Sequence, residues 1–238
     1  MIGAVKFDEY TRKARLQPCL ISLLPIGLLV LSLTARLSFS LGLGAAVAGT
    51  TGLTFLLSQL GRDLGKKKEQ KLWVDNGGSP TLHMLRHRYS GQNRTLLGVR
   101  HRCAERLIDD LHLPTEQDEL ENPNLADEKY DVVVKYLLAH TRDKDKFSLL
   151  FSELVNYGFR RNLWGLKTLG LAVLGVCGPI QAFLACFVDL AGARTSDAVC
   201  FMVDVALLFI WVFVINQNWV DSVSMAYAER LLECLQLL

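Results

Sequence analysis

The chain has 238 residues, half of them hydrophobic, and a formal net charge of +2 at pH 7. This length would fit one or two soluble domains, but the hydrophobic residues are distributed unevenly along the chain. The six cysteines are scattered and show no CxxC spacing, so the sequence supports neither a disulfide framework nor a zinc site.

Four segments are almost free of charged residues, and Asp204 is the only charged residue within them. Each is close to the length of about 20 apolar residues that a helix needs to cross a bilayer core roughly 30 Å thick. The alternative is a set of buried helices in a soluble core, but residues 20–33 are apolar around the whole helical circumference apart from two serines. The sequence therefore predicts an all-α integral membrane protein with four transmembrane helices, at residues 19–35, 37–60, 168–188 and 198–215.

The order of these segments divides the chain into four parts. Basic residues flank the first span, follow the second and precede the third, whereas the turns at residues 36 and 189–197 carry few. The positive-inside rule therefore predicts that both termini and the middle domain are cytoplasmic. The predicted parts are an N-terminal amphipathic segment with spans one and two (1–60), a cytoplasmic helical domain (61–163), spans three and four (164–216) and a C-terminal amphipathic helix (217–238).

Helical patterns fill the middle domain, and no alternating strand pattern appears. Ser79 and Pro80 form an N-cap and first-turn pair, which predicts a helix that continues to about Tyr89. The sequence predicts three further helices, from residue 94 to before Pro114, at 125–140 and at 146–163.

Charge separates this domain into two halves. Residues 61–106 carry eleven Lys or Arg against four Asp or Glu, a balance of +7, and residues 107–163 carry seven against twelve, a balance of −5. Arginine presents a fixed fork of donors suited to phosphate oxygens, and histidine can stack on bases, so the basic half is a candidate polyanion site. It could equally serve anionic headgroups or pair with the acidic half. The candidate ligand-binding residues are Arg86, His87, Arg88, Arg94, Arg100, His101, Arg102 and Arg106.

Polar residues inside the spans form a second candidate site. Thr50, Thr54 and Ser58 recur every four residues on one helical face, either to pack against other helices or to line a conduit. Asp204 lies about six residues inside an apolar span, where a carboxylate normally faces a partner or water. It could instead lie at a shallow depth, be protonated, or pair with Arg194 near the far surface. Gln181 follows Gly178-Pro179 and could bond the carbonyl that the proline leaves unpaired.

Catalytic and metal signatures are missing from the sequence. There is no P-loop, nucleophile elbow or paired-carboxylate motif, and His83 and His87 lack a third metal ligand. We therefore expect no enzymatic activity, no cofactor and no metal.

The architecture resembles the small transmembrane effectors of bacterial anti-phage systems, in particular the oligonucleotide-gated channel effectors of the Hailong type. The resemblance lies in the spans around a basic helical domain and in the clusters Arg86-His87-Arg88 and Arg100-His101-Arg102. It implies a homo-oligomeric ion channel that depolarises the inner membrane in antiviral defence. It also implies an oligonucleotide or cyclic-nucleotide ligand and a partner enzyme that makes it. In the channel hypothesis the predicted pore-lining residues are Thr50, Thr54, Ser58 and Asp204. The alternative functions are a non-conducting membrane scaffold and, in third place, a membrane-embedded enzyme.

Overall fold

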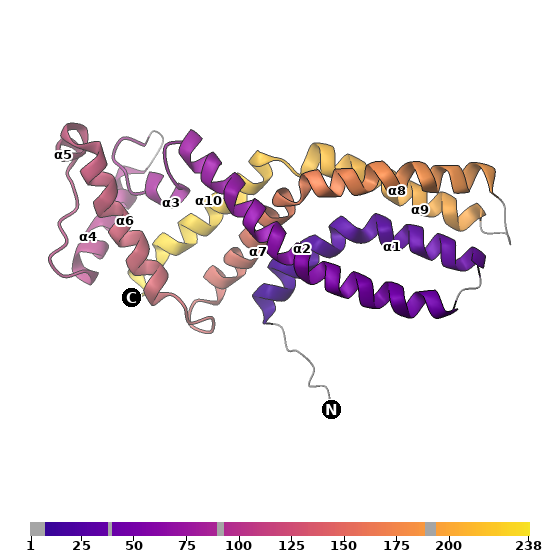
Figure 1. Ribbon diagram of the computed structural model, residues 1–238. Helices are drawn as coiled ribbons and strands as arrows, with labels where there is room; N and C mark the ends of the chain where they lie inside the picture. The colour runs from indigo at the N-terminus through magenta and orange to yellow at the C-terminus, as the bar shows by residue number, and fades with distance from the viewer. Residues whose placement is uncertain (1–7, 38–39, 90–92, 189–193) are drawn as a thin grey trace, which may run out of the picture. The chain divides into compact units, whose positions relative to one another are not determined.

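The computed structural model describes residues 8–37, 40–89, 93–188 and 194–238, and it describes only the backbone of residues 34–37, 40–51 and 194–195. Every regular element in these ranges is a helix (Figure 1), which confirms the all-α prediction. The chain divides into two compact units. Unit 1 comprises residues 1–69 and 158–220, and unit 2 comprises residues 70–157 and 221–238.

Unit 1 contains the long apolar helices. In Figure 1 the helices α8 and α9 run side by side, and α1 packs against α8. The elements are a π-helical segment (Thr11–Leu16), α1 (Gln17–Leu37), α2 (Ser40–Asp75) up to Glu69, the end of α7 (Ser148–Gly165), α8 (Lys167–Phe187), α9 (Arg194–Phe209), the π-helical segment η2 (Ile210–Val214) and the start of α10 (Gln217–Glu233).

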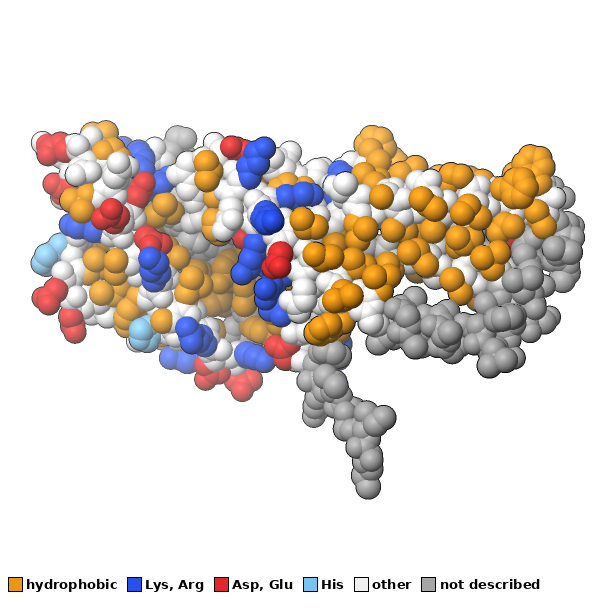
Figure 2. Space-filling view, in the orientation of Figure 1, with side chains coloured by type: hydrophobic (Ala, Val, Ile, Leu, Met, Phe, Trp, Pro, Cys, Tyr) orange, Lys and Arg blue, Asp and Glu red, His pale blue; other side chains and the backbone are white. Residues whose placement is uncertain are grey.

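Three helical stretches in the described residues are long and apolar enough to cross a membrane, namely Thr11–Leu33, Lys167–Phe187 and Ser196–Val214. They coincide with the first, third and fourth predicted spans. The second predicted span, residues 37–60, lies within the continuous helix α2, but many of its side chains are outside the described residues. Four spans therefore remain a prediction. Hydrophobic side chains cover most of the surface over α8 and α9 (Figure 2), as expected for helices in contact with lipid.

Close helix contacts in unit 1 depend on glycine. A Cβ atom added to Gly165 would lie 2.5 Å from the backbone nitrogen of Gly65, so α7 and α2 touch through their backbones. A Cβ atom added to Gly170 on α8 would lie 2.5 Å from the ring of Trp211, a fully buried residue of η2. Small residues at such crossings allow helices to approach closely, and larger ones there would force the helices apart.

The predicted topology can be tested by cysteine labelling. The exposed residues Lys67 and Ser196 should become accessible from opposite sides of the membrane when each is replaced by cysteine, because the predicted topology keeps the positive flanks in the cytoplasm. We expect Lys67→Cys to react only after permeabilisation and Ser196→Cys to react in intact cells. Gly65 is unsuitable for a label because its Cβ atom would lie 2.8 Å from the Arg161 carbonyl oxygen.

The parent chain is the control for this experiment, because Cys186 is itself exposed. Modification of both engineered cysteines from the outside would contradict the predicted topology.

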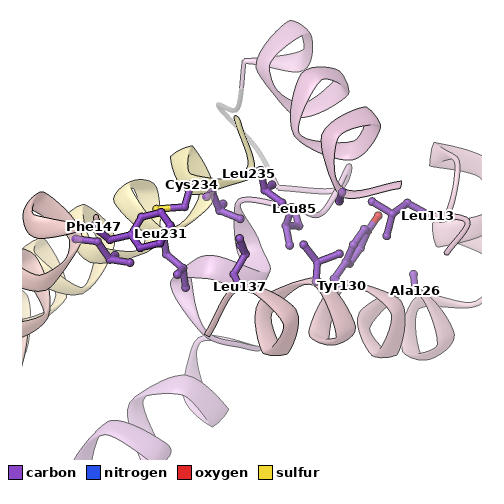
Figure 3. Close-up of a cluster of buried hydrophobic side chains, with 13 residues drawn as sticks. Leu85, Leu113, Ala126, Tyr130, Leu137, Phe147, Leu231, Cys234 and Leu235 are labelled. Carbon is purple, nitrogen blue, oxygen red and sulfur yellow. The ribbon is translucent and has the colours of Figure 1, made fainter. Parts of the chain in front are cut away.

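Unit 2 is a small helical bundle with its own hydrophobic core. Tyr130 and Leu137 of α6 meet Leu85 and the C-terminal residues Leu231 and Leu235 in this core (Figure 3). All five side chains are at most 3% exposed. The elements of unit 2 are the end of α2, α3 (Pro80–His83), α4 (Arg94–Leu107), α5 (Glu116–Glu121), α6 (Pro123–His140), the start of α7, most of α10 and the short helix η3 (Cys234–Gln236).

Two details of unit 2 differ from the sequence prediction. The helix that begins at Pro80 ends at His83 and does not continue to Tyr89. The reason is that the backbone amides of His87 and Arg88 donate to the Glu119 carboxylate, at 2.7 and 3.2 Å. The helix from residue 94 ends at Leu107, and the unpredicted helix α5 follows, stabilised by a capping box between Thr115 and Asp118.

Candidate functional site

Asp204 is the most unusual polar residue of unit 1. It lies on α9, inside the span Ser196–Val214, and its side chain is 2% exposed. Neither carboxylate oxygen has a hydrogen-bond partner among the described residues. A charged carboxylate in the middle of a transmembrane helix costs about 2.5–3.5 kcal/mol on insertion scales, and such residues normally face a partner, a water-filled cavity or an ion.

An apolar groove opens beside this carboxylate. Its volume is about 360 Å³, and residues of α8 and α9 line it. Gly175 and Gly178 lie on the α8 side, and a Cβ atom at either position would meet no atom within 4 Å. Leu174 and Leu208 contribute apolar side chains. Asp204 therefore borders an open groove, and a molecule that covers this face of α8 and α9 would lie next to its carboxylate.

Two other residues of the same helix bundle, Gln181 and Ser32, also carry a buried oxygen that has no hydrogen-bond partner among the described residues. The fully buried Gln181 was expected to bond the carbonyl that Pro179 leaves unpaired, but its Nε2 atom donates instead to the Pro25 carbonyl of α1, at 3.3 Å. The Oε1 atom of Gln181 and the hydroxyl of Ser32 have no partner among the described residues. Since buried polar groups are almost always hydrogen-bonded, these atoms mark the interior of unit 1 as a place where water or an ion would be stabilised.

The predicted hydroxyl stripe of the second span lies in a different environment. Thr54 and Ser58 are 9% and 3% exposed, and the Ser58 hydroxyl donates to the Phe55 carbonyl of its own helix at 2.6 Å. The side chain of Thr50 lies outside the described residues. The burial of Thr54 and Ser58 within one protomer favours the packing interpretation for these two residues.

Basic residues that flank the spans donate to backbone carbonyls. The Lys68 amino group donates to the Trp164 carbonyl at 2.6 Å, and Arg160 donates to the Trp219 carbonyl at 2.9 Å. Lys167, the first residue of α8, donates to the Ile215 carbonyl at 2.7 Å. Burial, followed by the nearby charge of Lys167, lowers the pKa of Lys68. Lys68 and Lys167 therefore donate to carbonyls at helix C-termini, as expected for positive charge there, whereas Arg160 donates to a carbonyl in the first turn of α10.

The arginine cluster of unit 2 is partly neutralised by the acidic half of the same domain. Arg86 makes a bidentate contact with Asp127, at 2.7 and 2.8 Å. Arg88 contacts Asp127 at 2.8 Å and the buried Glu119 at 3.1 Å. Arg94 pairs with Glu116 at 3.2 Å in an exposed position. For these three arginines the structure shows the internal pairing that the sequence left open.

Three further members of the predicted cluster contact backbone carbonyls within unit 2. His101 is buried and lies 2.8 Å from the Leu85 carbonyl, and burial lowers its pKa. His87 lies 3.1 Å from the Pro114 carbonyl through Nε2. Arg100 is 5% exposed and donates to the Met84 carbonyl at 3.4 Å; burial lowers its pKa, although Glu229 and Glu233 oppose the shift. These contacts place the three side chains in the packing of the bundle.

Arg102 and Arg106 complete the predicted cluster, and both are exposed on α4. They are four residues apart and therefore share one face of the helix. Neither makes an ion pair or a side-chain hydrogen bond with another described residue. The prediction that the basic cluster binds a polyanion stays untested, and these two side chains are the members best placed to do so. No group of three potential metal ligands occurs in the described part of the chain.

Comparisons with known proteins identify no relative. No family model matches the sequence, and no curated protein or solved structure matches the chain. Function therefore has to be inferred from the side chains themselves.

Proposed function

We propose that this chain is a ligand-gated homo-oligomeric membrane channel in which Asp204 faces a cation path formed between copies. The observation that carries the proposal is a buried carboxylate that has no hydrogen-bond partner in the described part of the chain and lies beside an open apolar groove. Several copies are needed because one protomer offers too few helices to enclose a wide aqueous path. A ring of carboxylates contributed by symmetric copies would favour cations over anions.

The cost of the unpartnered carboxylate supports assembly through this face. An isolated protomer would leave both oxygens without a hydrogen-bond partner next to lipid, and desolvation of an unpaired charge is costly. Association that brings the grooves of several copies together would give each Asp204 water, a cation or a neighbouring polar group. The resemblance to anti-phage effectors extends the proposal to an inner-membrane protein that depolarises the host cell.

Planar-bilayer recording of the purified full-length protein tests this proposal. We expect cation-selective current whose size changes when short oligonucleotides or cyclic nucleotides are added. The reversal potential in a salt gradient reports the selectivity, and chemical crosslinking in the same membranes reports the assembly. Absence of current with every ligand tried would contradict the channel proposal.

The exposed arginines carry a separate prediction about the ligand. Replacing Arg102 and Arg106 together by alanine should weaken binding of a single-stranded oligonucleotide, because both guanidinium groups are accessible. Each lost phosphate contact should reduce the slope of log affinity against log salt by about 0.7, so the pair should reduce it by about 1.4. Fluorescence anisotropy at several salt concentrations, with the full chain in detergent, measures both quantities.

The matched control replaces Lys135 and Arg142, two exposed basic residues of unit 2 outside the cluster. An equal loss of affinity in the control would show that binding follows net charge and involves no defined site.

A second candidate function is a membrane-anchored interaction protein that does not conduct. The internal pairing of Arg86 and Arg88 favours it, because side chains that neutralise Asp127 and Glu119 need no external polyanion. Such a protein would assemble without passing current and would tolerate the Arg102 and Arg106 substitutions.

A further inference from the structure

A small pocket in unit 2 lies between the end of α2, the α3 region and α10. Its volume is about 280 Å³, close to the lower end of the range for small-molecule sites. Aromatic and acceptor groups dominate the residues that line it, which include Trp73, Asn76, His83, Tyr89, Asp221 and Met225.

A glycine turn brings these residues together. Helix α2 ends at Asp75, and the next glycines have positive φ angles, +75° at Gly77 and +146° at Gly78, where side chains are strained. The amide of Gly78 donates to the Trp73 carbonyl at 2.7 Å, which closes the turn. Ser79 then caps α3 by accepting from the Leu82 amide. The chain reverses within a few residues and places His83 in the same pocket as Trp73.

His83 presents an unused acceptor. Its Nε2 atom is buried and has no hydrogen-bond partner among the described residues, while the ring hydrogen-bonds the Gly78 backbone. That bond must involve Nδ1, which donates to a carbonyl, so the neutral ring carries its lone pair on Nε2. Burial, followed by the charges of Arg86 and Arg88, lowers the pKa of His83 and keeps the ring neutral at pH 7. The Tyr89 ring meets it edge-on, with centroids 5.3 Å apart.

The charges around the pocket leave a single carboxylate uncompensated. Arg86 and Arg88 are held by Asp127 and Glu119, two cations against two anions. Asp221 has no ion pair or side-chain hydrogen bond among the described residues, and no Lys or Arg lines the pocket. A phosphate group would therefore find no lysine or arginine among the residues that line the pocket. A cation with N–H donors would find a carboxylate, a histidine lone pair and aromatic rings.

We propose that this pocket binds the primary ammonium group of a small organic molecule. Asp221 supplies the opposite charge, His83 Nε2 accepts one N–H bond, and the Trp73 and Tyr89 rings supply the aromatic surface that cations favour. The ammonium group can come from a free amine or from an aminoethyl lipid headgroup, which share this chemistry. The site is built from residues of unit 2, whereas Asp204 belongs to unit 1, and it does not depend on the channel proposal.

Isothermal titration calorimetry of the full-length protein in detergent tests the pocket, with chloride salts at constant ionic strength. We expect propylammonium and ethanolamine to bind, and tetramethylammonium, which has no N–H donor, to bind about tenfold more weakly. Asp221→Asn should weaken all three probes by about tenfold or more, since it removes the charge. His83→Phe keeps a ring and removes the lone pair, so it should weaken the primary amines and leave tetramethylammonium unchanged.

The control is Glu128→Gln, which makes the same charge change at an exposed position outside the pocket and should bind as the parent does. Binding of glycerophosphoethanolamine as tight as that of ethanolamine would assign a headgroup, and its exclusion would assign a free amine. The proposal is overturned if no ammonium probe binds, if Asp221→Asn binds like the parent, or if adenosine binds and the amines do not.

Discussion

Replacement of Asp204 by asparagine should reduce the cation current of the reconstituted protein by at least about tenfold, as removal of a charge near a permeating ion does. The side chain keeps its size, so packing against α8 should be preserved. The substitution removes the negative charge from each copy of the groove, and selectivity for cations over anions should fall together with the conductance. Planar-bilayer recordings in a salt gradient measure both.

The stability of the protein should increase when Asp204 is replaced by an apolar residue. Asp204→Leu replaces a buried carboxylate that has no partner among the described residues by an apolar side chain with the same branching, and it should raise the free energy of unfolding by about 1–3 kcal/mol. A residue that weakens the fold while serving transport is typical of functional sites. Thermal unfolding in detergent, followed by tryptophan fluorescence, measures the change.

The control for both measurements is Asp63→Asn, which makes the same chemical change at an exposed residue of unit 1. It should alter neither current nor stability. An Asp204→Asn protein that passes the same current as the parent would remove the main support for the channel proposal.

Replacement of Glu119 by glutamine should destabilise unit 2 by about 3–5 kcal/mol, the usual cost of removing one partner of a buried ion pair. The carboxylate is 1% exposed and accepts from the backbone amides of His87 and Arg88, from the Arg88 guanidinium and from the Tyr130 hydroxyl. A glutamine amide offers one acceptor oxygen and turns an N–H₂ group toward donors. Limited proteolysis would report this loss of stability, because the protease should cut the segment 84–89 sooner in the variant than in the parent.

Acid should produce a similar effect in the parent protein. Burial raises the pKa of Glu119, but the bonds from Tyr130, His87 and Arg88 outweigh it, and the pKa lies below the ordinary value of 4.5. A carboxyl group with a lowered pKa contributes stability above its unfolded pKa and loses it as the pH falls through the folded pKa. We therefore expect stability to fall as the pH drops below about 4.5, and Glu119→Gln should flatten this dependence.

Glu116→Gln is the matched control, because Glu116 makes an exposed pair with Arg94 and should cost less than about 1 kcal/mol. If Glu116→Gln and Glu119→Gln lower the free energy of unfolding by the same amount, Glu119 has no special role in the fold.

Much of the helical architecture was predictable because its signals are local. An apolar run of about 20 residues and a Ser79-Pro80 cap can be recognised without knowing any distant contact. The early end of α3 could not be predicted, because it depends on Glu119, more than thirty residues farther along the chain. Helix α5 was missed because its capping box precedes a short charged segment with no apolar periodicity.

For the candidate sites, too, local features were predictable from the sequence and contacts between distant residues were not. The position of Asp204 inside an apolar segment was evident from the sequence, and the structure adds that its side chain is buried among the neighbouring helices. The lack of a hydrogen-bond partner among the described residues depends on how the neighbouring helices pack, which a local sequence pattern does not determine. In the basic cluster, charge density alone could not separate ligand binding from internal pairing, because Arg86 and Asp127 are 41 residues apart.

In the proposed membrane arrangement, the contact between Lys167 and the end of η2 has a consequence for how the helices fit a bilayer. Its amino group donates to the carbonyls of Val212 and Ile215, which ties the first residue of α8 to the end of η2. A charged amine is costly to draw into hydrocarbon, so this pair of ends should stay at the water interface in membranes of any thickness. The helices must then adapt to a thicker or thinner bilayer by tilting, or by a change in how deeply their opposite ends, near Phe187 and Ser196, are inserted. In either case the depth of Asp204 relative to the bilayer centre would change.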